Sequence, residues 1–281
     1  MVPALSRRDP KAPDVPVSVA AIYRYPVKGL SPEPLERAKL APLNCLPHDR
    51  RFALARAATR IDPQRPEWLD KSHFFMLMRD EKLAQLRTRF DDASGEFNIE
   101  RDGRMLLRAR ITDAAGRAEI DAFFAEFLKD LPGGPPRVVE APGHTFADAK
   151  QKPGATGGQY VSFINLASIA TLEKVVGVPV DPLRFRANVY FSGTPAWSEL
   201  DWVGGEIGVG TVRLRVVSSI TRCAATMVNP ATAERDLDIP SILQREFSHN
   251  CMGVYGEVLA GGRIENGSAI DLSAASPLQA G

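Results

Sequence analysis

Short runs of β-forming residues, separated by turn residues, recur along most of this chain and constrain its fold more than any other feature. Residues 211–217 alternate apolar with basic side chains, which is the pattern of a half-buried strand. Residues 17–23 form another β-type run, and residues 97–99 and 105–107 predict a hairpin. The pattern therefore predicts a mainly β fold.

Helices are expected to be few. Residues 118–129 carry apolar side chains at helical spacing, which predicts one amphipathic helix. A second apolar stripe predicts a helix that ends at Gly177, and a short third helix is expected to start after Pro240.

The polar, glycine-containing run over residues 149–158 predicts a domain boundary. We expect an N-terminal β-rich domain over residues 17–157 and a C-terminal β-rich domain over residues 158–272. Residues 1–16 are expected to form a disordered tail, and residues 273–281 are expected to fray.

Composition excludes several classes of partner. The 281-residue chain is 44% apolar and 25% charged, as soluble globular proteins are. Its formal net charge of +1 gives no polyanion-binding footprint, so nucleic acid is not expected as a partner. No apolar run approaches the ~18 residues that span a bilayer, so no membrane association is expected. The three cysteines, an odd number, fit a reducing compartment and predict a cytoplasmic location.

Cys223 follows Arg222 at the end of an apolar run. A lone cysteine usually behaves as a small buried hydrophobe. A neighbouring guanidinium stabilises the thiolate, however, and the thiolate is the form that ligates metals. The predicted position at a strand end or loop is also where functional residues concentrate.

Two further groups of basic residues stand near predicted strand ends. Arg184, Arg186 and Asn188 would share one face of an extended segment, and arginine forks match phosphate oxygens. Lys28 follows the first predicted strand and Arg50 precedes the second. Each group also has a simpler explanation when it is considered alone. The first could be a solvated strand face, and Lys28 and Arg50 could be ordinary surface charges at strand ends.

In this order, the clusters resemble the MOSC domain, named for the C-terminal domain of molybdenum-cofactor sulfurases. The resemblance includes Arg184-Phe185-Arg186-Ala187-Asn188 and Thr221-Arg222-Cys223-Ala224-Ala225-Thr226. The segments Tyr25-Pro26-Val27-Lys28 and Asp49-Arg50-Arg51-Phe52 are similar to the N-terminal β-barrel module that accompanies this domain in the mitochondrial amidoxime-reducing components and their bacterial relatives. Together the resemblance covers about residues 17–272.

The resemblance implies a mainly β, barrel-like fold that binds molybdenum cofactor, in which the dithiolene of a phosphorylated pterin holds the metal. The cysteine that matches Cys223 ligates molybdenum in the relatives. The residues implied to hold the pterin and its phosphate are Lys28, Arg50, Arg186, Asn188, Thr221 and Arg222, with Asn165 near another contact position.

Three functions follow as hypotheses. The first is an oxidoreductase that reduces N-hydroxylated or related N-oxygenated small molecules, with electrons from a separate ferredoxin- or flavin-type partner. The second is a non-redox carrier, in which Cys223 binds the cofactor or holds a persulfide. The third is a degenerate binding module without chemistry, because Gly29 and Leu166 stand where hydroxyl residues are common in the relatives.

Overall fold

The computed structural model describes residues 16–62, 67–141, 143–148 and 159–275. The predicted tail up to residue 15, the predicted boundary loop over 149–158 and the last residues, 276–281, lie outside this part of the chain. Within it the protein is mainly β, as the sequence predicted, with fifteen strands and three α-helices.

The strands and helices have the following bounds. The strands are β1 Ser18–Arg24, β2 Glu33–Leu35, β3 Arg37–Leu40, β4 Phe52–Ala55, β5 Arg87–Phe90, β6 Glu96–Arg101, β7 Arg104–Arg110, β8 Arg137–Glu140, β9 Val161–Asn165, β10 Val189–Ser192, β11 Glu206–Val209, β12 Val212–Thr221, β13 Cys251–Ala260, β14 Gly262–Glu265 and β15 Ile270–Asp271. The α-helices are α1 Ala114–Phe127, α2 Leu166–Val176 and α3 Ile239–Phe247. The described residues also form five short 3₁₀ helices. These are η1 Lys71–His73, η2 Glu81–Gln85, η3 Pro182–Phe185, η4 Ser198–Trp202 and η5 Ala224–Met227.

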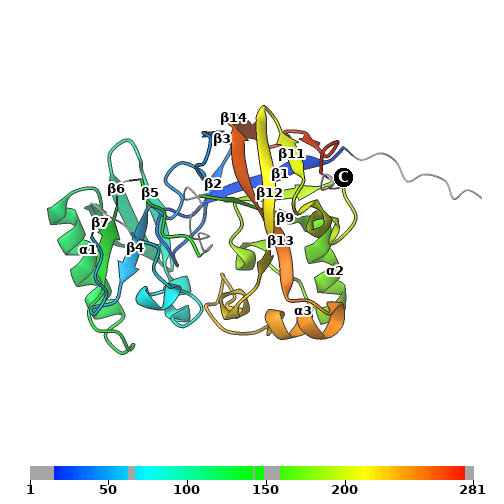
Figure 1. The fold of residues 1–281 in the computed structure, drawn as a ribbon. Coiled ribbons are helices and arrows are strands. Elements are labelled where there is room, and N and C mark those ends of the chain that lie inside the picture. The colour runs from blue at the N-terminus through cyan, green and yellow to red at the C-terminus, as the bar shows by residue number, and fades with distance from the viewer. Residues whose placement is uncertain (1–15, 63–66, 142, 149–158, 276–281) are drawn as a thin grey trace, which may run out of the picture.

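Eight strands form one curled sheet in the order β15-β11-β12-β13-β9-β10-β1-β2. Backbone hydrogen bonds join its β15 end back to β1. Ile270 N–H donates to Val17 O over 2.8 Å, and Val19 N–H donates to Ser268 O over 2.9 Å. The sheet therefore curls into a barrel (Figure 1). The first strand of the chain belongs to this barrel, so strand pairing crosses the predicted boundary at residue 157.

Apolar side chains at alternate positions along the strands point inward and fill the barrel. Along β12, Val212, Leu214 and Val216 are buried whereas Arg213 and Arg215 are exposed, as the sequence pattern predicted. Each fully buried Val or Leu contributes roughly 1.5–3 kcal/mol relative to its exposed state. The end of the chain adds to the same core, because Ala275, within the segment predicted to fray, is buried against it.

A second layered unit, called here the N-terminal lobe, contains β4 to β8 and α1 and lies beside the barrel (Figure 1). Its sheets, β4-β8 and β5-β6-β7, pack with α1 around a separate apolar core that includes Phe97, Ile120 and Phe124. Helix α1 begins at Ala114, earlier than predicted, because the Asp113 side chain accepts a hydrogen bond from Gly116 N over 2.8 Å and caps it.

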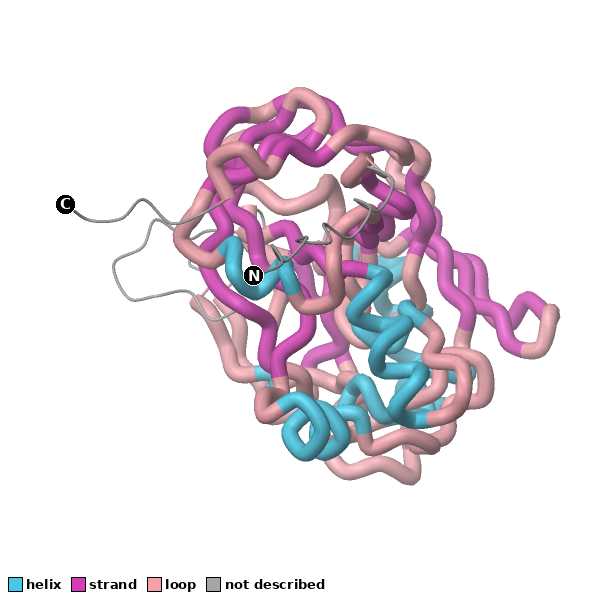
Figure 2. Tube along the Cα trace, turned by 90° about the vertical axis from the view of Figure 1, so that its right-hand side faces the viewer, coloured by secondary structure: helices cyan, strands magenta, loops and turns pink. Residues whose placement is uncertain are grey.

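The other two α-helices pack on the outside of the barrel (Figure 2). Helix α2 ends as predicted, with Gly177 in the left-handed conformation at φ 74°. Helix α3 contains Pro240 in its first turn rather than starting after it, because Asp238 caps the helix and proline is tolerated there. No helix among the described residues is long and apolar enough to cross a bilayer.

Candidate functional site

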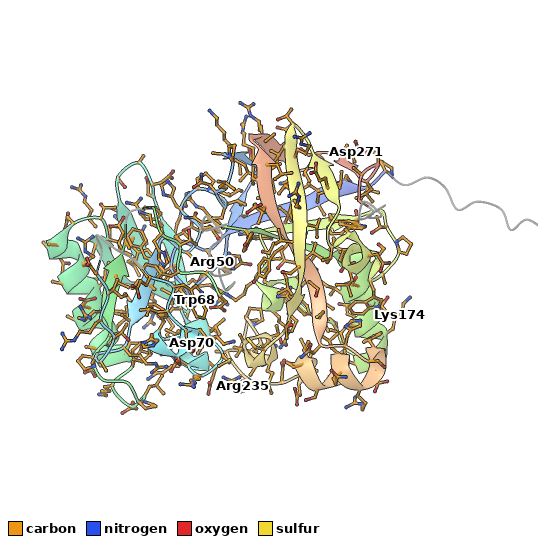
Figure 3. All side chains as sticks on the ribbon, in the orientation of Figure 1. Arg50, Trp68, Asp70, Lys174, Arg235 and Asp271 are labelled. Atoms are coloured by element: carbon orange, nitrogen blue, oxygen red, sulfur yellow. The ribbon has the colours of Figure 1, made fainter. Side chains whose placement is uncertain are left out.

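A cavity of about 440 Å³ lies between the barrel wall and the N-terminal lobe. Figure 3 shows Arg50 and Trp68 in this region, between the two halves of the molecule. The barrel contributes Ser162 of β9 and Tyr255 of β13, while the N-terminal lobe contributes Lys71. The cavity is thus a product of tertiary packing.

Most of the residues singled out in the sequence meet in this cavity. Its lining includes Lys28, Arg50, Arg186, Asn188, Thr221, Arg222 and Cys223. The implied contact position Asn165 is not part of the lining. Asn165 is fully buried and caps α2, accepting from Ala167 N over 3.0 Å and donating to Pro195 O over 2.7 Å. Its amide is used to start a helix and to tie down the next loop.

The cavity is strongly cationic, although the whole chain carries a net charge of only +1. Two carboxylates, Asp49 and Asp148, also line it. The cationic side chains in the lining are Lys28, Arg50, Lys71, Arg184, Arg186 and Arg222. A local excess of positive charge in a partly desolvated hollow attracts anions.

Two of these arginines, Arg184 and Arg222, form hydrogen bonds that connect neighbouring segments of the protein. Arg184 pairs with Asp236 over 2.7 Å and donates to Met227 O over 3.1 Å. Arg222 donates through Nε to Met252 O over 2.9 Å and through Nη1 to Phe185 O over 2.9 Å. Burial lowers the pKa of Arg222. Both side chains therefore hold the segments on either side of Cys223 in place.

Two other cations have carboxylate partners. Lys28 is 5% exposed and forms an ion pair with Asp148. Burial lowers the pKa of Lys28 and Asp148 acts against this effect. Arg50 pairs with Asp49, which is itself fixed by the Tyr25 backbone N–H over 2.8 Å.

Arg186 differs from Arg184, Lys28 and Arg50, which pair with carboxylates. In the part of the chain that the structure describes, its guanidinium makes one hydrogen bond, to Leu30 O over 2.7 Å, and no ion pair. Burial lowers its pKa to about 10, so it stays charged at neutral pH. Like Arg222 and Lys71 of the same lining, Arg186 has no ion pair with a carboxylate among the described residues.

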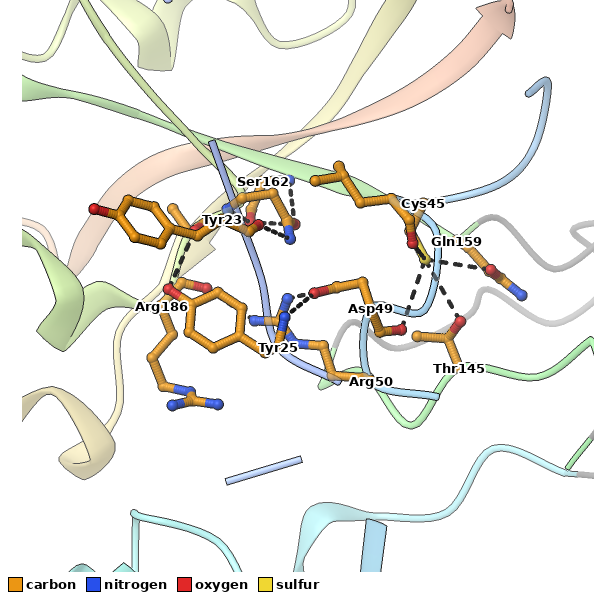
Figure 4. Close-up of polar contacts among 12 residues, drawn as sticks. Tyr23, Tyr25, Cys45, Asp49, Arg50, Thr145, Gln159, Ser162 and Arg186 are labelled. Carbon is orange, nitrogen blue, oxygen red and sulfur yellow. Dashed lines mark hydrogen bonds and ion pairs between the residues drawn. The ribbon is translucent and has the colours of Figure 1, made fainter. Parts of the chain in front are cut away.

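The ring of Tyr25 links Arg186 to Arg50 (Figure 4). Each guanidinium carbon lies 4.4 Å from the ring centroid, close enough for a cation–π contact. Burial raises the pKa of Tyr25 to about 12, against the effect of the two arginines. A neutral, fixed ring therefore holds two positive groups at one end of the cavity.

The backbone around these arginines corrects one sequence interpretation. Arg184, Arg186 and Asn188 do not share the face of an extended strand. Pro182 and the Asp181 cap start helix η3, and Arg186 follows it in the left-handed region at φ 53°. Arg50 is also left-handed, at φ 49°. This conformation costs about 1–2 kcal/mol for an ordinary residue, so surrounding contacts must hold it.

Asn188 and Gly29 have structural explanations. The Asn188 amide accepts from Ser162 N over 3.1 Å and donates to Tyr23 O over 3.2 Å, which locks β9, β10 and β1 together beneath the cavity. Gly29 has φ 83°, and a Cβ there would lie 3.2 Å from Met76 Cα. The turn beside Lys28 therefore requires glycine, so the missing hydroxyl residue is explained by backbone geometry.

Cys223 lies just past the end of β12, as predicted, and caps η5. Its backbone carbonyl accepts from Thr226 N over 3.0 Å and from Thr226 Oγ1 over 2.9 Å, which fixes the position of its Cα. Cys223 is partly exposed and lines the cavity, and its thiol forms no disulfide or hydrogen bond with the described residues. Nearby, Thr221 lies opposite Cys251 on β13.

Sequence reasoning missed several residues that shape the cavity. Asp148, Tyr25 and Tyr255 received no role, because their importance depends on contacts with residues far away in the chain. Asp49 could have been found from its place beside Arg50, since adjacent opposite charges near a strand start suggest an ion pair. Lys71 offered no signal.

The fold and the site together define a β-barrel protein with a thiol-bearing, cationic cavity at the barrel wall. Residues 143–271 match the family model of the MOSC domain, so this part of the chain is a MOSC domain. Two solved structures are similar in part. YiiM from Geobacillus stearothermophilus is 21% identical with a TM-score of 0.32, over 40% of this chain and 52% of that one. The YuaD protein from Bacillus subtilis is 12% identical with a TM-score of 0.40, and the match covers 91% of this chain and 94% of that one. No curated protein matches the chain.

Proposed function

We propose that this protein binds a molybdenum cofactor in the cationic cavity, with Cys223 as the ligand that the protein gives to the metal. The observation that carries the proposal is one cavity shared by the partly exposed Cys223 and by Arg186, a partly buried cation without a carboxylate partner among the described residues. A thiolate suits a soft, redox-active metal, and an arginine suits a phosphate.

The donor set fits such a group. No three His, Cys, Asp or Glu side chains gather as a metal site in the described chain. A metal at Cys223 would therefore have to bring its other ligands with it, as a metal held by sulfur atoms of an organic group does. The MOSC match over residues 143–271 supports the same assignment.

The residues would then divide into two groups. Arg186, Lys28 and Arg50 would bind and neutralise the phosphate end, with Tyr25 keeping the two guanidinium groups in place. Thr221 and Cys223 stand where the metal end would lie. When bound, the cofactor supplies two-electron redox chemistry at molybdenum.

The proposed reaction is the reduction of N-hydroxylated or related N-oxygenated compounds. Release of the hydroxyl oxygen as water consumes two electrons and two protons, so a separate ferredoxin- or flavin-type protein would supply the electrons. This finer assignment rests on the resemblance around Lys28 and Arg50 described above.

The test is the metal content of protein purified from a host that makes the cofactor. About one molybdenum per chain is expected for the wild type. Cys223→Ala should lose most of the metal and all reductase activity. Cys45→Ser is the matched control, because Cys45 is buried outside this cavity and burial raises its pKa to about 12.

Two results would contradict the proposal. Full metal content and activity in Cys223→Ala would exclude this thiol as the ligand. Folded wild-type protein without molybdenum would exclude the cofactor assignment, and a persulfide on Cys223 in that protein, detected by mass spectrometry, would favour the sulfur carrier instead.

A further inference from the structure

Tyr255 lines the same cavity as Cys223 and has no part in the function proposed above. It lies on β13, opposite Ser218 of β12 and Ser162 of β9. Alternation along β13 places Val254 in the barrel core and turns Tyr255 outward, into the cavity. The Tyr255 ring packs against Tyr160 with centroids 5.9 Å apart, which limits the directions that the phenol can take.

The Tyr255 hydroxyl is unused by the described protein. The buried tyrosines Tyr25 and Tyr190 use their hydroxyls to bond backbone carbonyls: Tyr25 donates to Ala187 O over 3.2 Å, and Tyr190 donates to Pro182 O over 2.8 Å. Tyr255 makes no hydrogen bond within the residues that the structure describes. A phenol that faces a cavity without a partner is available to a ligand.

Burial favours the protonated form of Tyr255. Burial raises the pKa of Tyr255, while Arg222 and Arg50 act against that shift and Asp148 and Cys223 add to it. Among these neighbours, Arg50 and Asp148 belong to the phosphate-binding end of the cavity and Cys223 to its thiol end. With its proton retained at neutral pH, the hydroxyl acts as a hydrogen-bond donor.

We propose that Tyr255 is a substrate-binding residue, whose hydroxyl donates a hydrogen bond to the oxygen atom of an N-hydroxylated substrate beside Cys223. The inference rests on the proposed function and adds to it a group that recognises the reacting oxygen. The ligand class is a small molecule with a hydroxyl oxygen on nitrogen. Compounds that lack this oxygen would gain nothing from Tyr255.

The test compares two ligands and two variants of the cofactor-loaded full chain by calorimetry. Benzamidoxime carries the oxygen, and benzamidine is the same molecule without it. Tyr255→Phe removes the hydroxyl and keeps the ring against Tyr160. One hydrogen bond contributes about 1.4 kcal/mol, or roughly tenfold in affinity. We therefore expect benzamidoxime to bind about tenfold more weakly to Tyr255→Phe, and benzamidine to bind as it does to the wild type.

Each ligand has the same charge in both variants, so charge differences cancel in the comparison. Tyr23→Phe is the matched control and should leave both affinities unchanged, because the Tyr23 ring packs against Tyr190 and is not part of the cavity lining. Molybdenum content and thermal stability of Tyr255→Phe should equal those of the wild type. In steady-state assays, kcat/KM for benzamidoxime should fall by a similar factor.

The possible failures are distinguishable. Equal weakening of both ligands in Tyr255→Phe, or no weakening of either, would overturn the role of Tyr255 and leave the proposed function standing. Molybdenum-loaded wild type that binds no benzamidoxime would overturn the proposed substrate class, and this inference with it.

Discussion

The carboxylate of Asp148 lies against the ammonium group of Lys28, in the position that an anionic ligand would take. We predict that Asp148→Asn binds inorganic pyrophosphate more tightly than the wild type, because the ligand no longer competes with a built-in negative charge. The Asp148 side chain is 52% exposed, so solvent screens the pair and the gain should be roughly three- to tenfold. Calorimetry at fixed ionic strength measures it.

Asp92 provides a matched control for this prediction. Its side chain is equally exposed, at 52%, and pairs with Arg24 outside the cavity. Asp92→Asn should bind pyrophosphate as the wild type does. Weaker binding by Asp148→Asn would instead mean that Asp148 helps to hold the ligand.

At the scale of elements, a buried carboxyl group joins η4 to α2. Glu199 of η4 is fully buried and accepts a hydrogen bond from Ser168 of α2 over 2.9 Å. Burial raises the pKa of Glu199 above its ordinary value. Folding therefore favours the protonated form, and stability falls as pH rises from the unfolded-state pKa through the higher native pKa.

Glu199→Gln keeps an acceptor for Ser168 but carries no charge. We predict a higher melting temperature than the wild type at pH 8 and a much smaller difference at pH 4, where the carboxyl group is mostly protonated in both states. Thermal unfolding across this pH range measures the effect. Glu126→Gln, on the exposed side of α1, should show no such trend. A lower melting temperature for Glu199→Gln at pH 8 would mean that the ionised carboxylate stabilises the fold.

At the scale of the whole molecule, Arg235 spans the two halves that enclose the cavity (Figure 3). Its Nη1 donates to Ala224 O over 2.9 Å on the barrel side. Its Nη2 donates over 3.0 Å to Leu77 O and pairs over 3.0 Å with Glu81 of the N-terminal lobe. We predict that Arg235→Ala lowers the free energy of unfolding by about 1–2 kcal/mol, because these hydrogen bonds are lost. Urea unfolding measures it.

The same substitution should weaken pyrophosphate binding, because the cavity walls come from both halves. Arg245→Ala is the control: Arg245 is 66% exposed and pairs only with its neighbour Glu246 among the described residues, so its loss should change stability by less than about 0.5 kcal/mol. An Arg235→Ala protein with unchanged stability and binding would show that other contacts hold the halves together.

The sequence by itself determined the features that depend on neighbours along the chain. Alternation over residues 211–217 predicted a strand, and Gly177 predicted the end of a helix. The identities of Lys28, Arg50, Arg186 and Cys223 predicted an anion site with a soft metal ligand, and all four line one cavity. These signals are local, because the backbone repeats every two or 3.6 residues and a side chain keeps its chemistry wherever it lies.

Tertiary structure alone decided how the charges are shared. Lys28 is neutralised by Asp148, which stands 120 positions away, whereas Arg186 keeps its charge without a carboxylate partner among the described residues. Asn165 was predicted near the cofactor, but it caps α2. Ion pairs and hydrogen bonds depend on distances of a few ångströms between segments that only the closed barrel and its neighbouring lobe bring together. No spacing within the chain encodes those distances.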